Sequence, residues 1–272
     1  MKNVQHNDLN LSYLVFGTGE EVVLCFHGHG KSAEDYAFLA NNSRKIISIN
    51  LFLHGKSTMG KHRISNDLIT HEDLKVLVEK ILHQETVQNF HLIAYSQGGR
   101  FALCIIPHFI AQLKSIHLMA IDGMNNYNFY SLTQRWKWTR KLFKRWTEKP
   151  EELNKIAAFL TRIKIIDKKL YDFLSYYTSE NERITLGYQA WATFRKLKPN
   201  YKLLKKVLKQ HKTPFHYIIG ENDKIITLKT AKKFLTKIDK EKNLTVIPFG
   251  HDLFKPEATD VLIKTIKIEE YA

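Results

Sequence analysis

A serine at the end of an apolar run has the local features of a reactive nucleophile. The run Phe90–Tyr95 is typical of a buried strand, and it leads through Ser96 into an apolar helical pattern that begins at Gly98. A serine on such a sharp turn is exposed at the carboxyl end of a sheet, and its neighbours two positions away must be small. Ala94 and Gly98 meet this requirement. The same serine could serve only as a cap of the following helix, so the motif by itself leaves both interpretations open.

The segment Ala94-Tyr95-Ser96-Gln97-Gly98 resembles the G-x-S-x-G nucleophile elbow of the α/β-hydrolase fold family, with alanine in place of the first glycine. Members of that family carry an acid and then a histidine further along the chain. In this chain Asp223 follows the apolar run 215–219, and His251 follows a glycine shortly before the last helical pattern. The resemblance implies that Ser96 is the nucleophile, His251 the general base and Asp223 the acid. Asp122, which follows the run 116–121, is the alternative acid.

These three residue types suit acyl transfer. A serine hydroxyl is a weak nucleophile until an imidazole accepts its proton. The imidazole in turn needs a carboxylate that fixes its tautomer and stabilises its protonated form. Ser96, His251 and Asp223 would supply the three parts.

A second loop resembles the part of the family's site that stabilises negative charge. The apolar run 22–26 ends in His27-Gly28-His29-Gly30, which is similar to the family's H-G-x-G oxyanion loop. The resemblance implies that the backbone N–H groups of His29 and Gln97 form the oxyanion hole. We expect the side chains of His27 and His29 to order the loop. The segment 50–57 resembles a further family loop, D-x-x-G-x-G-x-S, but Asn50 replaces the aspartate, which predicts a structural role.

The elements that must position these residues alternate along both flanks of the chain. Short β-rich runs cover 22–26, 46–51, 90–95, 116–121, 215–219 and 244–247, and helical patterns cover 68–84, 98–107, 228–238 and 255–268. This alternation predicts an α/β fold with a mostly parallel sheet flanked by helices. The run Leu9–Phe16, followed by Gly17-Thr18-Gly19, predicts an antiparallel edge hairpin.

A basic, tryptophan-rich insertion separates the two flanks. Residues 124–212 contain 21 of the 42 Lys and Arg, only 7 of the 27 Asp and Glu, and all four tryptophans. Its apolar residues recur at helical spacing. The resemblance implies an α/β-hydrolase core over 1–123 and 213–272, with 124–212 as an inserted helical cap, or lid.

Three interpretations of the basic insertion stay open. In the first, its lysines are solvated and its aromatic faces roof an apolar acyl pocket. In the second, the segment 135–146 lies on an anionic membrane surface, as basic amphipathic helices with tryptophan do. Nucleic-acid binding is the third and the least favoured.

Composition and motifs exclude several other classes of protein. The chain has 272 residues, of which 44% are hydrophobic, and this composition is typical of a folded protein. Its two cysteines, Cys25 and Cys104, are too few for a disulfide framework. Two Gly-Lys-Ser segments, at 30–32 and 55–57, lack the earlier glycine of a phosphate-binding loop. No zinc-binding motif is present either, so no cofactor or metal is expected. The chain has no apolar stretch typical of a membrane span or a leader, which predicts a cytoplasmic protein.

The resemblance therefore implies an enzyme, a serine hydrolase acting on carboxylic esters through a Ser-His-Asp triad and an acyl-enzyme. Carboxylesterases and lipase-like enzymes are the expected classes, with a small-molecule acyl substrate as the partner. Because a fold does not fix the reaction, two alternatives stay open. One is a thioesterase or C–C bond hydrolase of the same fold. The other is a non-catalytic binding protein that retains the scaffold.

Overall fold

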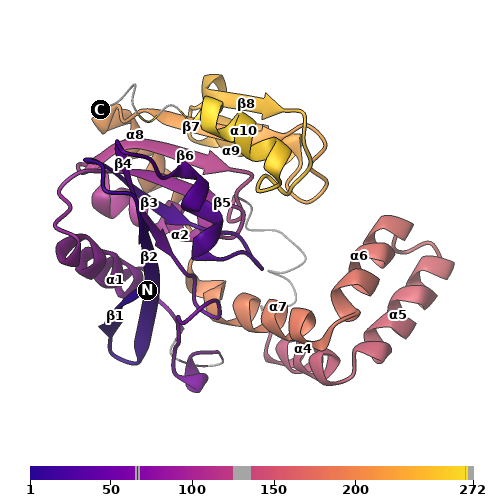
Figure 1. Cartoon of the computed structure of the whole chain (residues 1–272). Helices are drawn as coiled ribbons and strands as arrows, with labels where there is room; N and C mark the ends of the chain where they lie inside the picture. Colours follow the sequence, from indigo (N-terminus) through magenta and orange to yellow (C-terminus); the bar gives the residue numbers. More distant parts are fainter. Residues whose placement is uncertain (65, 67, 125–135, 267, 269–272) are drawn as a thin grey trace. The chain divides into compact units, whose positions relative to one another are not determined.

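The chain forms two compact units (Figure 1). A computed structural model describes residues 1–64, 66, 68–124, 136–266 and 268. Unit 1 comprises residues 1–60, 69–126 and 197–272, and unit 2 comprises residues 61–68 and 127–196. Arg135, at the start of the segment expected to lie on lipid, and residue 267 of the last predicted helix lie outside the described residues.

Unit 1 is built on an eight-stranded, mostly parallel sheet with the order β1-β2-β4-β3-β5-β6-β7-β8. β1 and β2 pair antiparallel, as do β2 and β4, and all the other neighbours are parallel. The strands are β1 (Lys2–His6), β2 (Leu9–Phe16), β3 (Glu21–Phe26), β4 (Arg44–Ile49), β5 (Phe90–Tyr95), β6 (Leu113–Met119), β7 (Phe215–Gly220) and β8 (Leu244–Ile247). The mostly parallel sheet predicted from the sequence is therefore confirmed.

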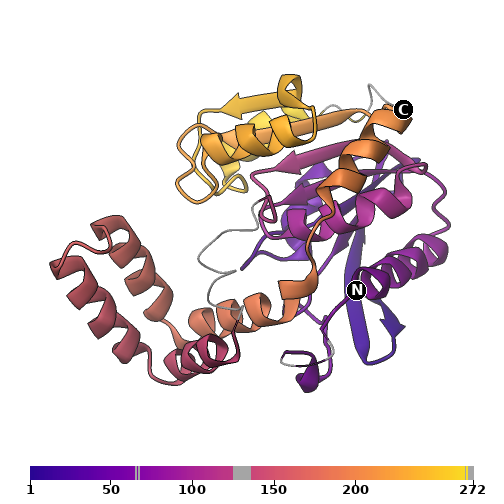
Figure 2. The same ribbon diagram turned by 180° about the vertical axis from the view of Figure 1, so that it is seen from behind.

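Helices cover both faces of this sheet. α1 (His71–Gln84), α2 (Gly98–Phe109) and α8 (Tyr201–His211) lie in front when the molecule is seen from behind (Figure 2). α10 (Pro256–Thr265) lies on the other face, which is turned forward in Figure 1. The remaining elements of unit 1 are α9 (Leu228–Lys237) and the 3₁₀ turns η1 (Ala33–Leu39) and η4 (Glu241–Asn243).

Local sequence explains where several of these elements begin. Thr70 caps α1, because its hydroxyl accepts from the Asp73 N–H at 3.1 Å while the Asp73 carboxylate accepts from the Thr70 N–H at 2.9 Å. Every residue of β5 is buried, as expected for a central strand with helices on both faces. Burial also raises the pKa of Cys104 to about 12, so this thiol is inert at neutral pH.

The antiparallel hairpin predicted at the edge of the sheet is present, but its second strand is not the one expected. The run Leu9–Phe16 pairs with the preceding strand β1, and its other side pairs with β4. β1 is therefore the edge strand and β2 is internal. The sequence signal was ambiguous because the polar segment Lys2–His6 has a weak apolar pattern.

Unit 2 is helical. Its helices are α4 (Lys137–Glu148), α5 (Pro150–Arg162), α6 (Lys168–Thr178) and α7 (Asn181–Thr193), with the 3₁₀ turns η2 (Lys61–Ile64) and η3 (Phe194–Lys196). An aromatic cluster around Phe143 forms its core, with the Trp146 and Trp191 rings 5.5 and 5.4 Å away, centroid to centroid. Among the helices formed by the described residues, none has both the length and the apolar character that a membrane span requires.

The second boundary of the insertion, expected after residue 212, lies after residue 196, and the first, expected after residue 123, lies after residue 126. α8 falls within the range 124–212, yet it belongs to unit 1, where Tyr201 packs against Phe234 at 6.2 Å between ring centroids. The segment 61–68, which the sequence assigned to the first flank, belongs to unit 2. Apolar spacing on α8 showed that it is amphipathic but not which unit its apolar face contacts.

Candidate active site

Ser96 lies on a strained turn between β5 and α2. Its φ angle is +47°, in the left-handed region that L-residues rarely occupy. Backbone hydrogen bonds to the end of β6 and the segment after it hold this conformation: the Ser96 N–H donates to Met119 O at 3.0 Å, and the Asp122 N–H donates to Ser96 O at 2.6 Å. The side chain is thereby lifted above the carboxyl ends of the strands.

The small residues that flank Ser96 are sterically required. A Cβ atom at Gly98 would lie 2.2 Å from the carbonyl oxygen of Phe26 and 2.6 Å from that of His27. Only glycine fits there, because β3 passes directly beneath the first turn of α2. Ala94 is fully buried between neighbouring strands.

Ser96, His251 and Asp223 form a continuous chain of hydrogen bonds. The distance from Ser96 Oγ to His251 Nε2 is 3.0 Å, and the distance from His251 Nδ1 to Asp223 Oδ2 is 2.7 Å. When the imidazole proton is on Nδ1, the Nδ1–H donates a hydrogen bond to the Asp223 carboxylate. Nε2 is then unprotonated and can accept the serine proton. The three side chains come from the ends of β5, β7 and β8, far apart in sequence.

Asp223 is held in place by its own loop. Its Oδ1 accepts from the N–H groups of Ile225 and Ile226, each at 2.8 Å, which leaves Oδ2 for His251. The carboxylate side chain is fully buried.

The loop of Asp223 is also joined to the loop that carries His251. The Asn222 N–H donates to Phe249 O at 2.9 Å. A Cβ atom at Gly220 would lie 2.3 Å from Gly250 O, so the two loops approach as closely as glycine allows. The distance between acid and base is therefore set by the backbone.

Asp122 has a different partner. Its Oδ2 accepts from Arg100 Nε at 3.2 Å and from Arg100 Nη2 at 2.9 Å, and its Oδ1 accepts from the Gly123 N–H at 2.6 Å. The Arg100–Asp122 ion pair ties the first turn of α2 to the end of β6. The structure brings Asp223, and not Asp122, to His251.

Tyr95 is a further residue that positions the site, and the sequence motif did not assign it a role. Its hydroxyl donates to His251 O at 2.8 Å, and its ring lies 4.9 Å from that of Phe254. The residue immediately before the serine thus fixes the backbone of the histidine. Its position inside the elbow motif was the only signal available in the sequence.

The loop after β3 lies directly beside Ser96. A Cβ atom at Gly28 would lie 3.1 Å from Ser96 Cβ, so the segment that carries His29 borders the serine. Gln97 is the N-cap of α2, and its N–H is among the donors that a helix start leaves without an intrahelical acceptor. Both residues are therefore in the region that the resemblance implies for the oxyanion hole, and their role stays a prediction.

Histidines order this loop, as expected for His27. His27 Nε2 accepts from the Leu51 N–H at 3.0 Å, and His54 Nε2 accepts from the Gly30 N–H at 3.1 Å. Burial, followed by the neighbouring His54, lowers the pKa of His27 to about 3. The same two causes lower the pKa of His29 to about 4. These rings are uncharged at neutral pH, so each has a ring nitrogen that can accept a hydrogen bond from a backbone N–H group.

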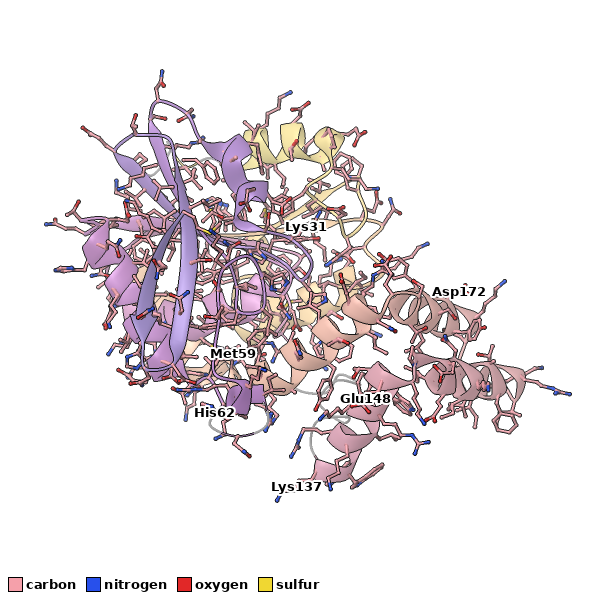
Figure 3. The ribbon with its side chains drawn as sticks, turned by 60° about the horizontal axis from the view of Figure 1, so that its bottom comes forward. Lys31, Met59, His62, Lys137, Glu148 and Asp172 are labelled. Carbon is pink, nitrogen blue, oxygen red and sulfur yellow. The ribbon has the colours of Figure 1, made fainter. Side chains whose placement is uncertain are left out.

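Two further contacts hold the loops near Ser96, one between the loops of His29 and His251 and one between the segment 50–57 and the start of η1. Lys31 Nζ lies 3.0 Å from Asp252 Oδ1, which links the loop of His29 to the residue after His251 (Figure 3 labels Lys31). Asn50 is fully buried, and its Oδ1 accepts from the Ala33 N–H at 2.9 Å, which is the structural role predicted for it. Over the described part of the chain, no group of three or more His, Cys, Asp or Glu side chains could hold a metal ion.

The chain matches the family model for the alpha/beta hydrolase fold over residues 21–258. It therefore belongs to the α/β-hydrolase fold family, as the sequence predicted. A comparison with curated protein sequences yields no match.

Solved structures with the same fold support this assignment. A thermophilic esterase from Thermogutta terrifontis is 15% identical with a TM-score of 0.67, and the match covers 100% of this chain and 99% of the other. A structure from a study of carboxylesterases of Nitrososphaera gargenis is 15% identical with a TM-score of 0.64, covering 100% of both chains. A thioesterase domain from the curacin biosynthetic pathway is 14% identical with a TM-score of 0.64, covering 97% of this chain and 98% of the other. The family and its hydrolase members support assignment of this chain as a hydrolase.

Proposed function

We propose that this protein is a serine hydrolase that cleaves carboxylic esters of small-molecule acyl substrates. The observation that carries the proposal is the hydrogen-bonded chain from Ser96 through His251 to Asp223, with a strained serine at its reactive end. A binding protein has no chemical need for a nucleophile, a base and an acid in this order.

The proposed reaction has two halves. His251 Nε2 takes the hydroxyl proton as Ser96 Oγ attacks the ester carbonyl carbon, and the buried Asp223 carboxylate stabilises the resulting imidazolium. The N–H groups of His29 and Gln97 hold the negative oxygen of the tetrahedral intermediate. The imidazolium then protonates the leaving alcohol, and an acyl group remains on Ser96. Water, deprotonated by His251, releases the acid and restores the serine.

Unit 2 is part of the proposal. It enters the chain between β6 and α8, where the resemblance places a helical cap, and we assign it that role.

A fluorophosphonate probe tests for the activated serine. We expect it to modify wild-type protein at Ser96, as located by peptide mass spectrometry, and to leave Ser96→Ala unmodified. A wild-type protein that resists the probe from pH 6 to pH 9 would refute the serine-hydrolase assignment.

A matched pair of substitutions tests the acid. Asp223→Asn removes the carboxylate that faces His251, and we expect ester hydrolysis to fall roughly 10³- to 10⁴-fold. Asp122→Asn weakens the Arg100 ion pair and should lower stability with a far smaller effect on turnover. A larger loss of turnover in Asp122→Asn than in Asp223→Asn would contradict the proposed roles.

A panel of acyl esters of increasing chain length, with the corresponding thioesters, tests the bond that is cleaved. We expect higher kcat/KM for the oxygen esters, with Ser96→Ala as the control. A consistent preference for thioesters would assign the chain to the thioesterases and leave the roles of Ser96, His251 and Asp223 unchanged.

A further inference from the structure

The apolar face of α5 extends beyond the residues that are buried within unit 2. Leu153 and Ala157 are buried, as expected for the side of the helix that faces the rest of the unit. Ile156, Phe159 and Ile163 follow at helical spacing on the adjacent side, with 43%, 59% and 46% of their surfaces exposed. Each of these three side chains therefore keeps a large exposed surface within the described part of unit 2, and we call the three the α5 strip.

Basic residues border this strip. Lys155 and Arg162 are exposed on α5, on the side of the strip away from the buried residues. Over residues 136–165 the chain carries nine Lys and Arg against three Glu. An apolar strip bordered by cations is the pattern of a helix that binds at the surface of an anionic bilayer.

α4 adds a second basic surface. Lys137, Lys141 and Lys144 are exposed at spacings of three and four residues, so they share one face of the helix. Trp138, the residue after Lys137, is 64% exposed and stacks on the Trp136 ring at 6.1 Å between ring centroids. Figure 3 labels Lys137 and Glu148, which mark the two ends of α4.

A salt bridge fixes α4 to α5. Arg145 donates from Nε and Nη2 to the two carboxylate oxygens of Glu152, both at 2.7 Å. The bidentate geometry restrains the angle between the two helices. Glu152 therefore pairs with Arg145, while Lys137, Lys141 and Lys144 are exposed to solvent.

We propose that unit 2 binds an anionic lipid surface, with the α5 strip at the boundary between headgroups and acyl chains. The lysines of α4 face the phosphates, and Trp138 lies at the headgroup level, where aromatic rings with a polar edge are favoured. The occupant is lipid rather than nucleic acid, because three uncharged aliphatic and aromatic side chains contribute nothing to phosphate binding in water. This proposal does not depend on ester hydrolysis.

Co-sedimentation with vesicles tests the proposal on the full chain. We expect Ser96→Ala protein to pellet at low salt with vesicles of equal parts phosphatidylglycerol and phosphatidylcholine. It should remain in solution with pure phosphatidylcholine, and the bound fraction should fall as salt is added. Use of the Ser96→Ala variant separates binding from any turnover of lipid.

Two substitutions in unit 2 test the surface itself. Each basic residue near an anionic bilayer contributes about fivefold to partitioning, so Lys141→Gln with Lys144→Gln should lower it about 25-fold. Phe159→Ala should lower it roughly tenfold, through lost apolar contact.

Matched controls lie in unit 1. Lys232→Gln with Lys233→Gln removes the same charge from exposed positions of α9, and Ile263→Ala shortens an exposed apolar side chain of α10. We expect neither control to change partitioning more than about twofold. An equal loss in the α9 variant would overturn the proposal, because net charge and not this surface would then drive binding.

Tryptophan fluorescence gives an independent readout, because all four tryptophans lie in unit 2. Binding should shift the emission to shorter wavelength and protect Trp138 from an aqueous quencher, with Trp138→Phe identifying its share. Failure of the wild-type chain to pellet with the anionic vesicles would overturn the proposal. If Trp138 were also protected without vesicles, the result would show that another part of the chain covers α4.

Discussion

The turn at Ser96 should depend on the absence of a single methyl group at Gly98. Gly98→Ala would place a Cβ atom 2.2 Å from Phe26 O and 2.6 Å from His27 O, closer than carbon and oxygen can approach. Both oxygens belong to backbone at the end of β3, a central strand paired on both sides. Because neither atom can rotate away, α2 or β3 must move.

The expected cost follows from the size of this overlap. Overpacking of a rigid core costs about 1–3 kcal/mol, and a clash with backbone on two atoms belongs at the upper end of that range. Alanine is a better helix former than glycine by at most about 1 kcal/mol, and Gly98 is the first helical residue, where this gain is smaller. We therefore expect Gly98→Ala to lower the free energy of unfolding by about 2–3 kcal/mol.

Urea unfolding followed by far-UV circular dichroism measures this change. Gly250→Ala is the matched control, because the nearest atom to its added Cβ is Asn222 O at 4.0 Å. We expect the control to stay within about 0.5 kcal/mol of wild type. Equal stabilities of the two variants would refute the steric reasoning. Labelling of Ser96 by a fluorophosphonate should fall in Gly98→Ala as well, since the turn that presents the hydroxyl has to shift.

Two further predictions concern backbone strain and pH. Ser96→Gly should be more stable than Ser96→Ala by about 1 kcal/mol in the same urea experiment, because glycine adopts the φ of +47° without strain; equal stabilities would refute stored strain at this residue. Burial of Glu85 raises its pKa, but hydrogen bonds from Lys2, Lys45 and Tyr13 outweigh this effect and lower the pKa from 4.5 to about 2. Its carboxylate therefore contributes about 3 kcal/mol to the free energy of unfolding above pH 4.5, and this contribution is lost as the pH falls toward 2. In urea titrations Glu85→Gln should not show this loss. Glu79→Gln, a change at an exposed position of α1, which ends just before Glu85, is the control and should keep the wild-type pH dependence.

The proposals in unit 2 and unit 1 stand on different observations. Lipid binding rests on uncovered apolar and basic side chains of α4 and α5, whereas ester hydrolysis rests on hydrogen bonds among Ser96, His251 and Asp223. A protein with both properties would act on acyl groups at or near a membrane surface. Either property can fail its own test without removing the other.

The sequence determined the elements and the elbow, because both depend on local interactions. Each predicted strand of the parallel sheet appears within a few residues of its expected ends, since an apolar run of that length has to be buried whichever neighbours cover it. The turn at Ser96 follows from Ala94 and Gly98 next to it in the chain. The family resemblance extended this local pattern to the distant histidine and acid.

Only the tertiary structure shows which of the two carboxylates, Asp223 or Asp122, lies beside His251. Asp223 follows β7 and Asp122 follows β6, and these neighbouring parallel strands end at the same edge of the sheet. Position in the sequence therefore places either carboxylate at the edge where His251 is expected. Arg100 forms an ion pair with Asp122. Backbone contacts of the loop after β8 bring His251 within hydrogen-bonding distance of Asp223. The unit to which α8 belongs was decided in the same way. In each case an ion pair or a packed face has several candidate partners along the chain, and the distances that select one exist only after folding.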